Sequence, residues 1–71
     1  LAPRIVAQIF GLVRQLVDSE GLSVLLVEQS ARSALSVADV GVVLNLGRVV
    51  VTDQAQRLIG DEDLRHAYLG F

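Results

Sequence analysis

The stretch Gly21-Leu-Ser-Val-Leu-Leu-Val-Glu-Gln-Ser30 is an apolar run that ends abruptly in three polar residues. The segment Leu22–Val27 holds one polar residue and follows a glycine, which is typical of a strand buried on both faces of a parallel sheet. Parallel α/β sheets bind their ligands beyond the carboxyl ends of their strands. We therefore expect a site at Glu28, Gln29 and Ser30. The alternative is that Gln29 and Ser30 only begin the next helix, with Ser30 as its N-cap.

The segments on either side of this strand have helical patterns. Apolar residues recur at helical spacing from Pro3 to Val17, and Gly21 can end that helix in a left-handed conformation. Residues Ser30–Ala38 predict a short helix with small residues on one side. A crossover of this length places the next strand, Val42–Leu44, parallel to the first strand and beside it.

The remaining chain predicts a hairpin followed by two helices. Asn45–Arg48 is a turn signal, after which Val49–Val51 returns as an antiparallel strand at the sheet edge. A helix is expected over Gln54–Ile59, and Asp61–Asp63 places negative charge on the first turn of a last helix that runs through Leu69. The predicted fold class is α/β, in the order α-β-α-β-β-α-α, with a parallel βαβ unit and an antiparallel hairpin strand.

Length and composition restrict the classes of protein that fit. Seventy-one residues allow one small domain, yet 52% of them are hydrophobic, so part of the apolar surface is expected to pack against something outside the chain. The net charge is −2 and the arginines are scattered, so a nucleic-acid partner is not indicated. No cysteine is present, which excludes disulfides and thiolate metal sites. No apolar run approaches the length of a membrane span.

No catalytic residue and no metal site is predicted from the residues alone. Asp61, Glu62 and Asp63 are consecutive at a helix start, where capping is the ordinary role of acidic residues. His66 is the only histidine, and it has no second ligand at a metal-binding spacing. The chain also lacks a glycine-rich phosphate loop and a nucleophile paired with a base.

Short pieces spread over the whole chain carry a resemblance to a known family. They are Leu1-Ala2-Pro3, Ile9-Phe10, Leu25-Leu26-Val27-Glu28-Gln29, Ala34-Leu35, Ala38-Asp39, Gly41, Val43-Leu44, Gly47-Arg48-Val49-Val50 and Ala67-Tyr68-Leu69-Gly70. In this order they resemble the C-terminal part of the ATP-binding subunits of ABC transporters. More narrowly, they are similar to the LivF type, which serves importers of branched-chain amino acids.

The resemblance implies a fold and the roles of four residues. Residues 1–71 would be a fragment of a three-layer P-loop NTPase-type domain, from the tail of the D-loop to the C-terminus. Leu1, Ala2 and Pro3 would be that tail and would face a second ATP-binding subunit. Gln29 would occupy the switch position near the γ-phosphate, where many members carry histidine, while Ser30 departs from the expected asparagine.

The resemblance also implies cofactors, partners and location for the complete subunit. It would use ATP and Mg, bind membrane permease subunits, and lie in the cytoplasm at the inner face of the cell membrane. The Walker A, signature and Walker B motifs would all lie upstream of Leu1, so the isolated fragment is expected to bind no cofactor and to hydrolyse no ATP. The alternative is a free-standing module that acts by partner binding or as a homo-oligomer, because a sheet without neighbours leaves an edge open.

Overall fold

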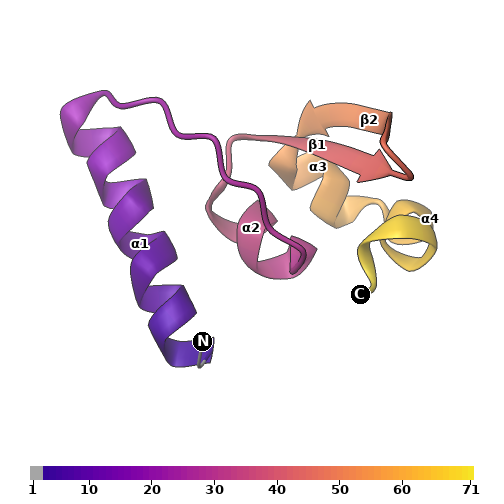
Figure 1. The fold of residues 1–71 in the computed structure, drawn as a ribbon, viewed down its shortest axis with the longest axis horizontal. Helices are drawn as coiled ribbons and strands as arrows, with labels where there is room; N and C mark the ends of the chain where they lie inside the picture. Colours follow the sequence, from indigo (N-terminus) through magenta and orange to yellow (C-terminus); the bar gives the residue numbers. More distant parts are fainter. Residues whose placement is uncertain (1–2) are drawn as a thin grey trace.

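The computed structural model describes residues 3–71 as a mixed helix and strand fold (Figure 1). In chain order its elements are α1 (Pro3–Glu20), α2 (Ala31–Val37), β1 (Val40–Asn45), β2 (Arg48–Gln54), α3 (Ala55–Gly60), α4 (Glu62–Leu64) and the π-helical turn η1 (Arg65–Leu69). Within the described residues the sheet consists of β1 and β2 alone. No helix of this part of the chain is both long enough and apolar enough to cross a membrane.

The antiparallel hairpin predicted from the turn signal is confirmed. β1 pairs with β2 from Val40 opposite Gln54 to Asn45 opposite Arg48. The two loop residues, Leu46 and Gly47, have φ angles of 52° and 77°, which is the sign combination of the type I′ turns that suit the twist of a two-residue hairpin. Both strands are longer than the apolar triplets that predicted them, because the residues flanking each triplet also join the ladder.

The core lies between the hairpin and the short helices α2 and α3. Its buried residues are Leu35, Val43, Ala55 and Leu58, and the partly buried residues packed against them are Ala31, Ala38, Val51, Leu64 and Leu69. Gly41 allows this close packing, because a Cβ atom there would lie 2.5 Å from Leu58 Cδ1 and 2.7 Å from Leu35 Cδ2. Gly41 is therefore a buried strand residue that the two helices require to be small.

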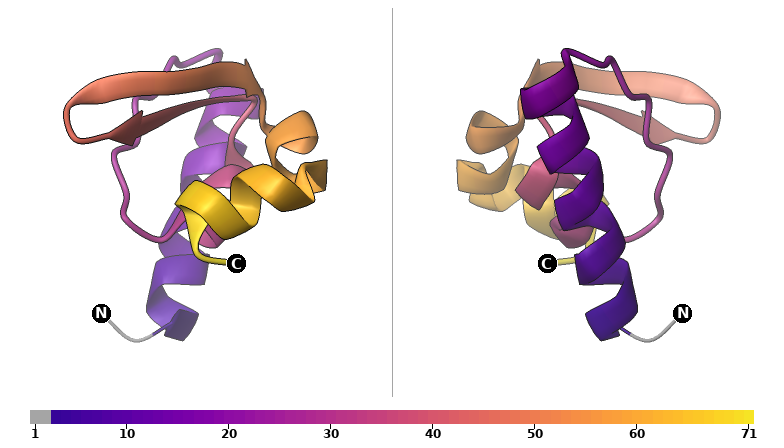
Figure 2. Two further views of the ribbon diagram at one scale, coloured as in Figure 1. Left: turned by 90° about the vertical axis from the view of Figure 1, so that its right-hand side faces the viewer. Right: turned by 90° about the vertical axis from the view of Figure 1, so that its left-hand side faces the viewer.

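Helix α1 stands apart from the hairpin and contacts α2 (Figures 1 and 2). Phe10 is its one buried residue among those described. Arg14 links α1 to the end of α2, because one of its N–H groups donates to the Val37 carbonyl oxygen at 3.0 Å. The same guanidinium pairs with Asp18 at 2.6 Å and with Asp39 at 3.0 Å. The helix predicted from the apolar stripe is formed, but most of the apolar side chains in that stripe are exposed to solvent.

The strand predicted over Leu22–Val27 is not formed. This segment links α1 to α2 without regular secondary structure, and Leu25 and Val27 are 91% and 85% exposed. A strand is stabilised by ladder hydrogen bonds to its neighbours and by side chains that cover its faces, and residues 3–71 supply neither here. The predicted parallel βαβ unit is consequently missing from this part of the chain, and the order begins α-α-β-β.

The helices after the hairpin are confirmed in place and differ in detail. The helix predicted over Gln54–Ile59 occupies Ala55–Gly60. The predicted last helix begins at Glu62, and its final residues Arg65–Leu69 widen into the π-helical turn η1. Asp61 is the N-cap, and its carboxylate accepts a hydrogen bond from the Leu64 N–H at 3.0 Å, as expected for an acidic residue at a helix start.

Candidate functional site

Gln29 lies at the bend where the extended segment meets α2. The Glu28 carboxylate accepts hydrogen bonds from the backbone N–H groups of Gln29 at 3.0 Å and Ser30 at 3.1 Å. Ser30 is the N-cap of α2 by its backbone, and its carbonyl accepts from the Ala34 N–H at 3.1 Å. The alternative of a helix start at Ser30 is therefore correct for the backbone, although its hydroxyl bonds the Ser33 side chain instead of a helix N–H.

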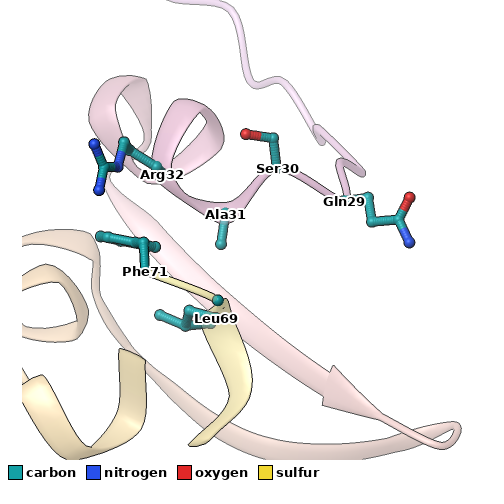
Figure 3. Close-up of a pocket in the computed structure, with 7 residues that line it drawn as sticks. Gln29, Ser30, Ala31, Arg32, Leu69 and Phe71 are labelled. Carbon is teal, nitrogen blue, oxygen red and sulfur yellow. The ribbon is translucent and has the colours of Figure 1, made fainter. Parts of the chain in front are cut away.

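Gln29 borders an open hollow of about 350 Å³ between the start of α2 and the last residues of the chain (Figure 3). The lining residues are Gln29, Ser30, Ala31, Arg32, Leu69, Gly70 and Phe71. The Gln29 carboxamide points away from Arg32 and Phe71 (Figure 3). Among the described residues this carboxamide has no hydrogen-bond partner, so both of its polar atoms are available to a molecule outside the chain.

A glutamine in this position can orient a ligand but cannot exchange a proton with it. Its amide group both donates and accepts hydrogen bonds, which suits a phosphate oxygen or a water molecule. It has no titratable proton near neutral pH, so acid–base catalysis is not within its chemistry. The site geometry thus supports a positioning or sensing role for Gln29.

The sequence did not predict Arg32 and Phe71, which line the hollow with Gln29, or Arg65, which contacts the Phe71 ring. The Arg32 guanidinium carbon lies 5.0 Å from the centre of the Phe71 ring, and that of Arg65 lies 5.3 Å from it. Arg65 Nε is buried and has no hydrogen-bond partner among the described residues. The one sequence signal that could have indicated this cluster is Gly70, which suits a chain reversal before an aromatic residue.

The predicted subunit-interface residues are placed only in part. Leu1 and Ala2 lie outside the described residues. Pro3 begins α1, is exposed, and lines a groove between α1 and α2 that also includes Phe10 and Glu28. Pro3 and Gln29 line different hollows, and the interface role of Pro3 and the ATP-binding role of Gln29 both stay predictions.

The other polar residues considered in the sequence have local partners or face solvent. Asp61 caps α4, and His66 is exposed on η1. Asp18 has a lowered pKa because its carboxylate accepts hydrogen bonds from the Arg14 guanidinium. From Pro3 to Phe71, no three histidine, aspartate or glutamate side chains lie close enough together to hold a metal ion.

Comparison with known proteins reveals a similarity over nearly the whole chain. No protein-family model matches the chain. Over 70 residues, or 99% of its length, the chain is 47% identical to the high-affinity branched-chain amino acid transport ATP-binding protein BraG of Pseudomonas aeruginosa. The chain spans 30% of the length of that relative. The similarity thus covers practically all of this chain and less than a third of a transport ATP-binding protein.

Proposed function

We propose that this chain is part of the ATP-binding subunit of an ABC importer for branched-chain amino acids, of the LivF type. It would contribute the switch region around Gln29 and the C-terminal helices. The observation that supports this most directly is the 47% identity to BraG through 99% of the chain. ATP and Mg would be bound by the complete subunit.

The extended segment Leu22–Val27 supports the idea that a larger sheet is involved. All ten residues from Gly21 to Ser30 are exposed, although the apolar run has the composition of a strand buried on both faces. In the complete three-layer P-loop NTPase-type domain this segment would be such a strand, and the rest of the subunit would cover it. The parallel βαβ unit would then form between this strand and β1.

Gln29 would act at the γ-phosphate of ATP. In P-loop ATPases the phosphates are held by the P-loop backbone and lysine, Mg is held by acidic and hydroxyl side chains, and a further residue orients the attacking water. The Gln29 carboxamide fits that last role because it ends at a bend beyond an apolar segment and has no partner within residues 3–71. Pro3, with Leu1 and Ala2, would face the second ATP-binding subunit.

This chain by itself would not hydrolyse ATP. Its sequence contains no lysine, so it cannot supply the P-loop lysine, and it has no glycine-rich phosphate loop. The remaining groups would come from the complete subunit. That subunit would lie in the cytoplasm against membrane permease subunits at the inner face of the membrane.

A graft into BraG tests the proposal in a complete subunit. The matching segment of BraG is replaced by this chain, and ATPase activity is measured in the assembled transporter together with the thermal midpoint of the subunit. We expect the graft to retain ATPase activity. Gln29→Ala should lower kcat by about 10²-fold or more, as loss of a positioning group in the transition state does.

Gln56→Ala is the matched control, because Gln56 is an exposed glutamine on α3. It should leave kcat unchanged. A graft that folds and assembles but has no ATPase activity would overturn the assignment of this chain to the family's switch region. Equal activity of the Gln29 and Gln56 variants would remove Gln29 from the ATP site.

A second candidate function, self-association of the chain, is favoured by its surface area. The accessible surface is 5564 Å² for 7.6 kDa, whereas a compact monomer of this mass exposes about 4,300 Å². The excess of roughly 1,300 Å² exceeds the ~800 Å² that each partner buries in a standard interface. The open strand edges of the hairpin offer a place for such pairing.

Sedimentation of the purified chain with and without Mg-ATP separates the two candidates. A homo-oligomer that forms regardless of nucleotide would support the self-associating module. A monomer in both conditions would exclude it and leave the transporter subunit as the function. A change of state on addition of Mg-ATP would contradict the inactivity proposed for the isolated chain.

A further inference from the structure

Phe71 lies against two guanidinium groups that have no acidic partner among residues 3–71. Arg32 and Arg65 are 5.0 Å and 5.3 Å from the centre of its ring, within the range of attractive cation–π contacts. The ion pairs within residues 3–71 involve Arg14 and Arg57 only. The aromatic ring is therefore the group that holds these two arginines together.

The backbone at Leu69 and Gly70 places Phe71 beside the two arginines. Leu69 packs against the core, and Gly70 then takes the left-handed conformation, with φ 79° and ψ 15°. Its N–H donates to the Arg65 carbonyl oxygen at 2.9 Å. This reversal brings the Phe71 ring against the guanidinium of Arg65 on η1 and toward Arg32 on α2 (Figure 3). A residue other than glycine at position 70 would be strained in this conformation.

Arg32 connects this cluster to Gln29. It is the second residue of α2, three positions after Gln29, and both residues line the hollow beside Phe71. The segment before Gln29 is exposed throughout, and it contacts Gln29 through a local hydrogen bond from the Gln29 N–H to the Glu28 carboxylate at 3.0 Å. The fixed contacts on the other side are Ala31 against the core and Arg32 against Phe71.

We propose that Arg32, Arg65 and Phe71 form an aromatic clamp that holds the first turn of α2, and through it Gln29, in position. Phe71 is thus a positioning residue for the switch glutamine, far from it in sequence. The role of the clamp in ATP hydrolysis rests on the proposed function, whereas its effect on the start of α2 does not.

Hydrogen exchange in the chain itself tests the clamp without nucleotide. The Ala34 amide, which bonds the Ser30 carbonyl at 3.1 Å, reports on the first turn of α2. We expect Phe71→Ala to speed its exchange by roughly tenfold, and Phe71→Tyr, which keeps the ring, to leave it unchanged. Tyr68→Ala, the loss of an exposed ring on η1, is the matched control and should have no effect.

Two further variants separate the clamp from general packing of the last residues. Arg32→Lys keeps a cation over the ring and should preserve slow exchange at Ala34, whereas Arg32→Gln should speed it. Unchanged exchange in both Phe71→Ala and Arg32→Gln would overturn the clamp. So would an equal increase in the Tyr68→Ala control.

The BraG graft tests the consequence for hydrolysis. Phe71→Ala should lower kcat several-fold with KM and the thermal midpoint nearly unchanged, and Phe71→Tyr should restore kcat. Normal activity of Phe71→Ala beside an impaired Gln29→Ala would overturn the positioning role and leave the proposed function intact. Normal activity of both variants would instead show that Gln29 is not part of the ATP site. The hydrogen-exchange result would still decide whether the clamp exists.

Discussion

Residues 31–71 and residues 3–30 are similarly rich in apolar side chains, but only the later region forms a buried cluster. All four residues of the buried cluster, Leu35, Val43, Ala55 and Leu58, come from the later region. The earlier region buries Phe10 alone among its described residues and exposes the apolar side chains of the extended segment. An apolar pattern therefore predicts which side chains need to be buried. It does not predict whether the residues that bury them lie on the same chain.

The largest expected effect comes from removing side-chain volume in the later region. Leu58 is 2% exposed and sits at the centre of the cluster, so Leu58→Ala should cost about 2 to 5 kcal/mol of unfolding free energy. A domain of this size has about 4 to 10 kcal/mol in total, so the variant is expected to be partly unfolded. The measurement is urea unfolding followed by circular dichroism.

Leu25→Ala is the matched control in the earlier region, because it makes the same change at a side chain that is 91% exposed. We expect it to change the unfolding free energy by less than about 0.5 kcal/mol. If the two variants were equally destabilised, Leu25 would have to be covered in solution, and the contrast between the two regions would disappear.

A second pair of variants adds a methyl group to each region. Gly41→Ala places a Cβ against Leu58 Cδ1 and Leu35 Cδ2, so two buried leucines have to shift, and we expect a loss of about 1 to 3 kcal/mol. Gly11→Ala meets no atom within 4 Å in the middle of α1, and there alanine should stabilise by about 0.5 to 1 kcal/mol. Thermal unfolding of the two variants should therefore shift in opposite directions, and a shift in the same direction would contradict this assignment of the two glycines.

Local signals in the sequence predicted the elements that depend on local physics. The turn at Asn45–Arg48 predicted the hairpin, and Asp61 was expected at a helix start, where it caps α4. The strand over Leu22–Val27 failed because burial on both faces requires partners, and a pattern does not say whether those partners lie on the same chain.

The candidate site was predictable at Gln29 and Ser30, which both line the hollow. Gln29 was found because polar residues follow an apolar run, and the structure places it at an exposed bend next to a hollow. Arg32, Arg65 and Phe71 were missed, because they are separated along the chain and meet only through the left-handed turn at Gly70. Contacts of this kind depend on tertiary packing, for which a single sequence carries no periodic signal.

The smallest expected effect concerns the acid dependence of the link between the two regions. Arg14 Nη2 and Nε donate to the two oxygens of Asp18 at 2.6 Å and 3.2 Å, and this lowers the Asp18 pKa. A carboxylate whose pKa is lower in the folded chain than in the unfolded chain stabilises the fold above the unfolded pKa. That stabilisation is lost as the pH falls through the folded pKa. Because Asp18 is exposed and Arg14 is only partly buried, the effect on stability should be small and should weaken with salt.

The Asp18 titration followed by NMR is the direct measurement of this effect. In the unmodified chain its pKa should lie below the ordinary aspartate value, and Arg14→Gln should return it toward that value. Arg4→Gln removes another charge from α1 and should leave the Asp18 titration unchanged, because the hydrogen bonds to Arg14 remain.

Arg14→Gln should also speed amide exchange in α1 at neutral pH, since the same side chain contacts the Val37 carbonyl and Asp39. An ordinary Asp18 pKa with unchanged exchange in the variant would mean that Arg14 does not join the two regions. Helix α1 would then be held by apolar packing, in which Phe10 is the buried residue.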